Sequence, residues 1–156
     1  MNTIQAFEKD MYLQSDFLKS FKNQKILSSN QQTNAIFSGS GDSLVSAMLA
    51  ESFSGGIVRA MDPLDLLKNK QLVKSKHVYF ISISGNTVSN IKVAKTTKKT
   101  TAITSMPYSR LAKISDDTIL LSAPNHGVFT AGSISFLESA LTCISLIKKI
   151  NISNHL

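Results

Sequence analysis

Residues 78–94, VYFISISGNTVSNIKVA, decide how the rest of this chain is organised. An apolar run at 78–83 ends abruptly at the turn 84–87 (SGNT), and apolar residues at helical spacing then start at Val88. A short apolar run bounded by turn residues is typical of a buried strand. The stretch therefore predicts a buried strand, a tight turn rich in hydroxyl groups, and the N-terminus of a helix.

The predicted turn is suited to binding an anion. The first N–H groups of a helix have no partner within the helix, and the helix dipole places partial positive charge there. These two properties together favour phosphate at such a terminus. Ser82, Ser84 and Thr87 add neutral hydroxyl donors, which can bind phosphate oxygens without adding charge. We therefore expect this turn to bind a phosphate group.

The composition indicates an ordered globular chain. Its 156 residues, 42% hydrophobic and 17% charged, predict a single domain over residues 1–156 with a sizeable core. One cysteine, Cys143, lies in an apolar pattern and is expected in the core of a protein from a reducing compartment. The charged N-terminus does not fit a signal peptide, and no segment is long and apolar enough to span a membrane. We therefore expect a cytoplasmic protein without a membrane partner.

The net charge of +7 is compatible with nucleic-acid binding. The basic residues are scattered along the chain, however, and aromatic residues are not interleaved with them. No helix-turn-helix or zinc pattern is present in front of the domain. A solvated, lysine-rich surface is therefore the favoured interpretation, and we expect no nucleic-acid partner.

Predicted helices and strands alternate along the chain. Apolar residues at helical spacing predict an amphipathic N-terminal helix over residues 1–22, and a polar linker follows at 28–34. A sheet core is expected over 35–122, and a long, mostly apolar helix over 128–150. The expected strands are 35–37, one that starts at 57, 78–83, 101–104 and 118–121. The helix after the first strand is expected to bury its large apolar residues, which are Leu44, Val45, Met48, Leu49 and Phe53.

Short apolar strands that alternate with helices indicate a parallel sheet with helices on both faces, a three-layer α/β/α sandwich. We expect five strands in the flavodoxin-like order 2-1-3-4-5. In that order strands one and three are neighbours, and the chain winds away from them in opposite directions. Two turns rich in glycine and hydroxyl groups, 38–43 and 82–87, follow these two strands. Both turns are therefore expected at one crevice.

Each turn taken alone has a simpler interpretation. The first has Leu44 where a dinucleotide-binding motif would have its third glycine, and it lacks the Lys-Ser/Thr of a P-loop. It would then be an ordinary tight turn, and residues 84–87 would be a plain helix cap. The convergence of the two turns at one edge of the sheet favours a ligand pocket over these interpretations.

At these residues the chain resembles the sugar isomerase (SIS) domain family, over about residues 35–147. Four segments carry the resemblance, in family order: 39–43 (GSGDS), 82–87 (SISGNT), 109–112 (SRLA) with 115–116 (SD), and 123–124 (AP) with 127–128 (GV). The second segment is the specific one, because it matches the family pattern S-x-S-G-[EN]-T. The family fold is a five-stranded parallel sheet between helices. The resemblance implies that a sugar phosphate is bound by Gly41, Ser43, Ser82, Ser84 and Thr87.

Asn86 is the variant that resembles archaeal-type phosphoglucose/phosphomannose isomerases. Hexulose-phosphate isomerases and the aminotransferase that makes glucosamine 6-phosphate usually carry glutamate there. The resemblance implies an aldose–ketose isomerase for a hexose or hexosamine 6-phosphate, acting without metal or other cofactor. A non-catalytic phosphosugar-binding sensor or partner subunit is the alternative. Because such proteins often use two SIS modules, one module implies a homodimer or homotetramer with pockets close to the subunit interface.

Aldose–ketose isomerisation moves a proton between C1 and C2 and needs a base, usually a carboxylate or histidine. His126, in the loop before the last helix, is the best-placed candidate, although a loop histidine is more often a solvated side chain. Glu138, within that helix, is the second candidate, with a surface or interface position as its alternative. Hexulose-phosphate isomerases carry a glutamate in this loop, where the present chain has Thr130.

Three other titratable residues fit other roles better. Glu51 lies midway along a predicted helix, where an exposed position is favoured. Asp62 precedes Pro63 and is expected to cap a helix, although it also lies within reach of the predicted pocket rim. His77 comes before the central strand and is therefore expected at the end of the sheet opposite the crevice.

Overall fold

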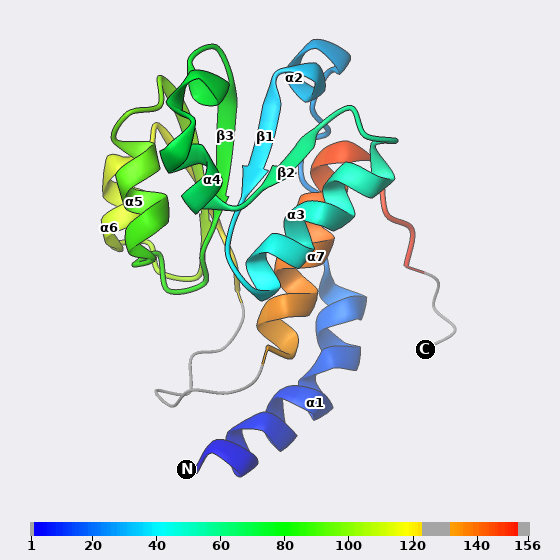
Figure 1. Ribbon diagram of the computed structural model, residues 1–156. Helices are drawn as coiled ribbons and strands as arrows, with labels where there is room; N and C mark the ends of the chain where they lie inside the picture. Colours follow the sequence, from blue (N-terminus) through cyan, green and yellow to red (C-terminus); the bar gives the residue numbers. More distant parts are fainter. Residues whose placement is uncertain (1, 123–131, 153–156) are drawn as a thin grey trace.

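The computed structural model describes residues 2–122 and 132–152 (Figure 1). The helices are α1 (Thr3–Ser20), α2 (Ser29–Thr33), α3 (Asp42–Phe53), α4 (Pro63–Lys68), α5 (Val88–Ala94), α6 (Arg110–Ile114) and α7 (Ile134–Ile147), with a 3₁₀ turn η1 (Lys70–Val73). The strands are β1 (Ala35–Ser38), β2 (Arg59–Met61), β3 (His77–Ile81), β4 (Lys99–Thr104) and β5 (Asp117–Leu120).

The five strands form one parallel sheet in the order β2-β1-β3-β4-β5, as predicted. Ser38, at the end of β1, pairs with Met61 of β2 and with Phe80 of β3. The chain leaves the central β1/β3 pair in opposite directions, because β2 lies outside β1 whereas β4 and β5 lie outside β3. The sheet therefore has its topological switch point between β1 and β3.

Helices cover both faces of the sheet (Figure 1). Helices α3 and α7 lie on one face, where they share a core with Phe37, Tyr79 and Ile103. Helices α4, α5 and α6 lie on the other face, and their core includes Val78 and Phe80. Successive strand residues point to opposite faces, so β1, β3 and β4 each contribute residues to both cores. The three-layer arrangement is thus confirmed.

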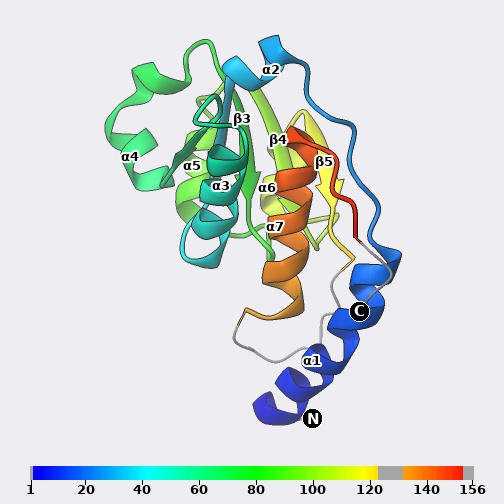
Figure 2. The ribbon, with the colours of Figure 1, turned by 90° about the vertical axis from the view of Figure 1, so that its right-hand side faces the viewer.

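The N-terminal segment differs in part from the prediction. Helix α1 extends beyond the sheet, close to α7, and a connecting segment then runs back along α7 towards α2 (Figures 1 and 2). Residues 28–34 are not simply a polar linker, because 29–33 form the helix α2. Its start is fixed by a capping box, in which the Ser28 hydroxyl accepts from the Gln31 N–H and the Gln31 side chain accepts from the Ser28 N–H.

The prediction for the buried side of α3 was wrong for three of its five residues, whereas Leu44 and Leu49 are partly buried. Three of its large apolar residues are exposed: Val45 (45%), Met48 (53%) and Phe53 (47%). The residues that α3 buries are Ser46, Ala47 and Ala50. Small residues face inward because α3 packs closely on α7, with the Ser46 and Ser139 hydroxyl oxygens 2.9 Å apart. About half of the surface of Val45, Met48 and Phe53 is therefore exposed.

The last helix is shorter than the predicted range 128–150. Helix α7 begins at Ile134 and ends at Ile147, and residues 123–131 lie outside the described part of the chain. Cys143 of α7 is completely buried in the core between the sheet and the helices α3 and α7, as expected. Within the described residues, no helix is long and apolar enough to cross a membrane.

Candidate functional site

The two glycine turns leave the sheet at the same edge. Strands β1 and β3 run parallel and pair directly, so the residues that follow Ser38 and Ile81 emerge side by side at their C-terminal ends. The first turn leads into α3, and the second leads into α5. The switch point predicted from the sequence is thus present, with both turns at its rim.

The second turn is held in one conformation by glycine. Gly85 has a φ of 60°, in the left-handed region that favours glycine, and its N–H donates to the Ser82 carbonyl at 2.9 Å. Asn86 closes the turn locally, because its side-chain N–H donates to the Ser84 carbonyl at 2.9 Å. The Ser84 side chain is exposed, whereas Ser82 is buried. The turn therefore presents Ser84 to solvent above a buried serine.

Thr87 is the N-cap residue of α5, but its hydroxyl does not cap the helix. Within the described residues, no helix N–H donates to this hydroxyl. The Thr87 Oγ1 lies instead 2.9 Å from the Ser82 Oγ. A plain helix cap therefore does not explain this threonine. Because α5 has only seven residues, its dipole is short, and the hydroxyl groups are the main polar feature of the turn.

Residues far along the sequence support this turn. The Thr104 hydroxyl donates to the Ile83 carbonyl at 3.0 Å, and the Leu111 N–H donates to the Gly85 carbonyl at 2.9 Å. A Cβ atom added at Gly85 would collide with the Ser109 side chain. Ser109 is itself fixed, because its hydroxyl accepts from the Ala112 N–H as the N-cap of α6. Contacts of this kind join segments that are far apart in the sequence, so the sequence pattern gave no sign of them.

The first turn is also tightly packed. Gly41 is the N-cap of α3, with a φ of 60°, and it has no side chain that could accept from the first N–H groups of the helix. A Cβ atom at Gly39 would lie 2.6 Å from the Cβ of Ser43, so the turn folds back closely over the start of α3. Ser40 donates to Asp62 at 3.3 Å. Asp62 also accepts from the Leu64 N–H as the N-cap of α4, which confirms the predicted cap.

Two further groups at this edge were not among the predicted site residues. The buried Ser38 hydroxyl, at the end of β1, has no hydrogen-bond partner among the described residues. The position of Ser38 directly before Gly39 was the available signal. The Asp42 carboxylate lies against Gly132, just before α7, because a Cβ atom at Gly132 would collide with it. This acidic group of the first turn is thereby directed towards α7.

Glu138 is buried, with 5% of its surface exposed, so the alternative of a surface position was wrong. Its carboxylate accepts from the Ser122 N–H at 2.6 Å and from the Ser122 hydroxyl at 2.7 Å. Ser122 follows β5, so Glu138 lies near the same edge of the parallel sheet as the two turns. These two bonds fix the orientation of the carboxylate. His126 and Thr130 lie outside the described residues.

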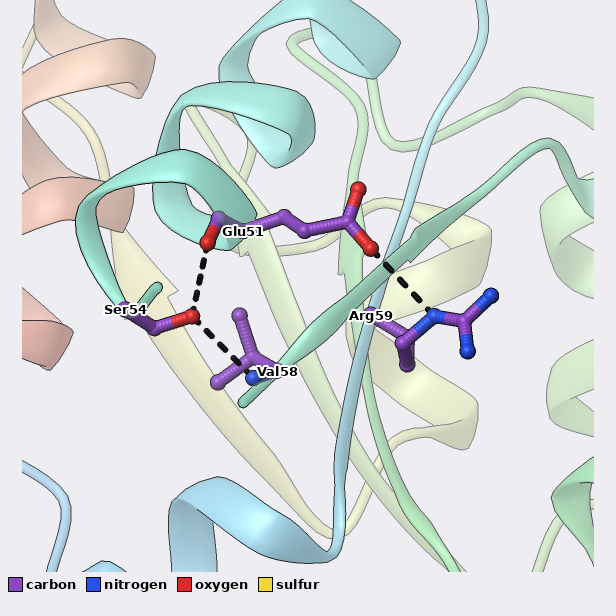
Figure 3. A network of polar contacts seen from close by, with 4 residues as sticks. All are labelled: Glu51, Ser54, Val58 and Arg59. Carbon is purple, nitrogen blue, oxygen red and sulfur yellow. Dashed lines mark hydrogen bonds and ion pairs between the residues drawn. The ribbon is translucent and has the colours of Figure 1, made fainter. Parts of the chain in front are cut away.

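Glu51 lies away from the turns, near the C-terminal end of α3 (Figure 3). Its side chain is 32% exposed and pairs with Arg59 of the edge strand β2 at 3.3 Å. The neighbouring Ser54 hydroxyl donates to the Glu51 carbonyl and accepts from the Val58 N–H. This network joins the end of α3 to the start of β2. Glu51 therefore has a structural role in the fold.

His77 is the first residue of β3 and therefore lies at the opposite edge of the sheet, as predicted. Its Nε2 lies 2.8 Å from the Thr101 hydroxyl. Burial, and then the positive charge of Lys99, lower the pKa of His77 to about 4. The imidazole is therefore neutral at neutral pH, far from the two glycine turns.

The fold is shared with solved structures of proteins that handle phosphorylated sugars. The chain superposes on the C-terminal domain of glucosamine-fructose-6-phosphate aminotransferase from Francisella tularensis with a TM-score of 0.67 and 19% identity, over 90% of this chain and 46% of that one. An Escherichia coli protein in complex with a sugar phosphate gives a TM-score of 0.60 and 19% identity, over 93% and 84%. The NanR protein of Vibrio vulnificus, complexed with ManNAc-6P, gives 0.57 and 15%, over 91% and 56%.

These neighbours define the class of fold, which is the α/β fold of SIS-type proteins. No protein-family model matches the sequence, and a search of curated proteins finds no match. The superpositions establish the shared fold. Identities below one fifth do not establish a shared activity, because one fold supports many functions.

Proposed function

We propose that the two glycine turns at the β1/β3 switch point bind the phosphate group of a sugar phosphate. The observation that carries this proposal is the Ser82–Thr87 hydroxyl pair, which lies in the turn after β3 and does not serve to cap α5. Exposed Ser84 and the open N-terminus of α3 at Gly41 and Ser43 add further neutral donors at the same edge. Neutral donors suit a dianion when they are fixed in advance by the fold.

Two kinds of structural neighbour support two functions for such a site. The aminotransferase domain belongs to an enzyme, whereas NanR was solved as a complex with ManNAc-6P. We favour an aldose–ketose isomerase acting on a hexose or hexosamine 6-phosphate. The second candidate is a phosphosugar-binding protein without catalysis, such as a sensor or a partner subunit.

For the isomerase, Glu138 and His126 remain the proposed catalytic groups. Glu138 carries the clearer physical argument, because its carboxylate is buried near the C-terminal edge of the sheet. The two bonds from Ser122 fix its orientation. A base held in this way needs little reorganisation when it takes a proton from the sugar carbon.

We also propose that the protein assembles as a homodimer or homotetramer. Large apolar side chains are exposed on two helices: Ile4, Met11 and Tyr12 on α1, and Val45, Met48 and Phe53 on α3. Apolar groups gathered on a surface in this way are typical of protein interfaces. Sedimentation equilibrium of wild type, Met11→Asp and Met48→Asp tests this, with Lys98→Gln as the control. Monomeric behaviour of the wild type would refute the assembly.

A coupled assay with the 6-phosphates of glucose, mannose, fructose and glucosamine tests the proposed activity. Turnover of any of them, with no response to the unphosphorylated sugars, supports the isomerase. Calorimetric binding of a 6-phosphate without turnover supports the sensor. Absence of both binding and turnover with all four compounds would remove the proposed function.

A further inference from the structure

A cavity of about 360 Å³ lies at the edge of the sheet opposite the glycine turns. It is lined by the N-terminal ends of β3, β4 and β5, by residues 24–27 of the segment between α1 and α2, and by the end of α7. None of its lining residues belongs to the two glycine turns. Its volume falls at the lower end of the range for small-molecule sites, so a small ligand would fill it.

Part of the wall of this cavity is apolar. Leu27, Ile119 and Leu146 line it, and the Leu27 N–H donates to the Leu146 carbonyl at 2.8 Å. This bond fastens the connecting segment, which runs beside the end of α7 in Figure 2. The Tyr79 ring stacks on His77 with ring centroids 4.3 Å apart. An apolar group entering the cavity would therefore meet a surface that is already formed.

Two of the polar residues that line the cavity, His77 and Tyr79, are uncharged at neutral pH. His77 is neutral there because burial lowers its pKa to about 4, and its Nε2 is engaged with the Thr101 hydroxyl. Burial, and then the charge of Asp117, raise the pKa of Tyr79 to about 12, so its phenol keeps its proton. A ligand group placed against these side chains would therefore carry no net charge.

Charged side chains of both signs line the same cavity. Lys25, Lys99, Asp116 and Asp117 are among its lining residues, and the charges of Lys99, Asp116 and Asp117 act on the pKa of His77 in the same cavity. Asp116 is fixed, because its carboxylate accepts from the Thr100 N–H at 2.8 Å and from the Thr100 hydroxyl at 2.9 Å. These bonds lower the pKa of Asp116 and keep it ionised. A simple anion such as phosphate could pair with the two lysines but would leave the two carboxylates without a cationic partner.

We propose that this cavity binds a free α-amino acid with an apolar side chain. The carboxylate of the ligand pairs with Lys25 and Lys99, and its ammonium group pairs with Asp116 and Asp117. The apolar side chain packs against Leu27, Ile119 and Leu146. A zwitterion satisfies both signs of charge, whereas an apolar molecule would partly desolvate the four charged groups without giving them oppositely charged partners. The proposal does not depend on the function assigned to the glycine turns.

Isothermal titration calorimetry with L-leucine and L-phenylalanine tests the ligand class. We expect binding of at least one of them, and an affinity about tenfold lower for N-acetyl-L-leucine and for L-leucinamide, each of which lacks one of the two charges. The proposal is overturned if neither amino acid binds at millimolar concentration. It is equally overturned if the two analogues bind as tightly as L-leucine.

Variants locate the bound amino acid. We expect Lys99→Gln and Asp117→Asn each to weaken its binding about fivefold, because both side chains are part of the cavity lining. Lys98→Gln is the matched control, since this exposed lysine is the neighbour of Lys99 and does not line the cavity. Unchanged melting temperatures show that each variant is folded. An equal affinity of Lys99→Gln and Lys98→Gln would place the ligand elsewhere.

Discussion

The hydroxyl oxygens of Ser82 and Thr87 lie 2.9 Å apart across the turn that joins β3 to α5. One of the two hydroxyl groups donates to the other, so the pair keeps one proton that can be donated to a ligand. Ser82 is buried at 3% exposure, whereas Thr87 is only partly buried. The inner serine therefore orients the outer threonine, and the two should act as a unit.

The pair can be tested with a double-mutant cycle. We expect Ser82→Ala and Thr87→Val each to weaken binding of a hexose 6-phosphate. The double variant should lose less than the sum of the two, with a coupling of about 0.5–2 kcal/mol, because each change removes the same internal bond. Calorimetric titration of all four proteins measures the coupling. Strictly additive losses would show that the two hydroxyls act independently.

Ser84 is the exposed hydroxyl of the same turn. We expect Ser84→Ala to weaken binding of the sugar phosphate by about 1.5–3 kcal/mol, the usual contribution of a hydrogen bond to a charged group. Thr97→Ala is the control, because the Thr97 hydroxyl bonds to the Val93 carbonyl at the far end of α5. An affinity that is unchanged in Ser84→Ala and in a Thr87 variant would show that the phosphate does not bind at this turn.

Replacing Gly85 tests how much the packing of this turn contributes to the stability of the fold. In Gly85→Ala the new methyl group collides with Ser109, and the left-handed backbone is also unfavourable. We expect the free energy of unfolding to fall by about 2–4 kcal/mol, measured by urea denaturation. Gly55→Ala is the matched control, since Gly55 has a similar φ of 66° but open space around it. A loss of about 1 kcal/mol is expected there. Equal losses in both variants would contradict the steric argument.

Glu138 is expected to affect both stability and turnover. Glu138→Gln keeps the shape of the side chain but replaces a charged acceptor of two bonds from Ser122. We expect the free energy of unfolding to fall by about 1–3 kcal/mol, and any isomerase turnover to fall by about 100-fold or more. Ser122→Ala is the comparison, because it removes one bond and leaves the carboxylate. If both variants lose turnover to the same small extent, Glu138 has a structural role only.

His77 makes the stability of the fold depend on pH. Its pKa is about 4 in the folded chain and 6.5 ordinarily, so the unfolded chain binds a proton in this window that the folded chain does not. Stability should therefore decrease as pH falls from 6.5 towards 4. Urea unfolding at several pH values should show a smaller decrease for His77→Gln. An unchanged pH dependence in this variant would contradict the assignment.

Much of the fold could be predicted from local pattern. The apolar run 78–83, its abrupt end and the helical spacing after Val88 correspond to β3, the turn and α5. The Asp62-Pro63 pair correctly marked the start of α4. Strand order followed from the alternation of strands and helices together with the two turns that follow β1 and β3. These features depend on residues close together in the sequence, where periodicity and capping act.

Local pattern failed where packing between elements decides which side of a helix is buried. In α3 the large residues Val45 and Met48 are exposed while Ser46 and Ala47 face α7, because small side chains allow two helices to approach closely. Hydrophobicity alone ranks these residues in the opposite order. The helix at 29–33 differs, because its polar residues show no apolar periodicity and its local signal is the capping box at Ser28 and Gln31.

By itself the sequence determined the parallel sheet, its switch point and the run of hydroxyl residues that follows β3, because these depend on periodicity and on glycine within short segments. Only the tertiary structure decided that the Thr87 hydroxyl bonds to Ser82, that Ser109 closes over Gly85, and that Glu138 is buried against Ser122. The reason is that such contacts join elements whose separation in the chain hides them. Their geometry is fixed by how the helices pack on the sheet.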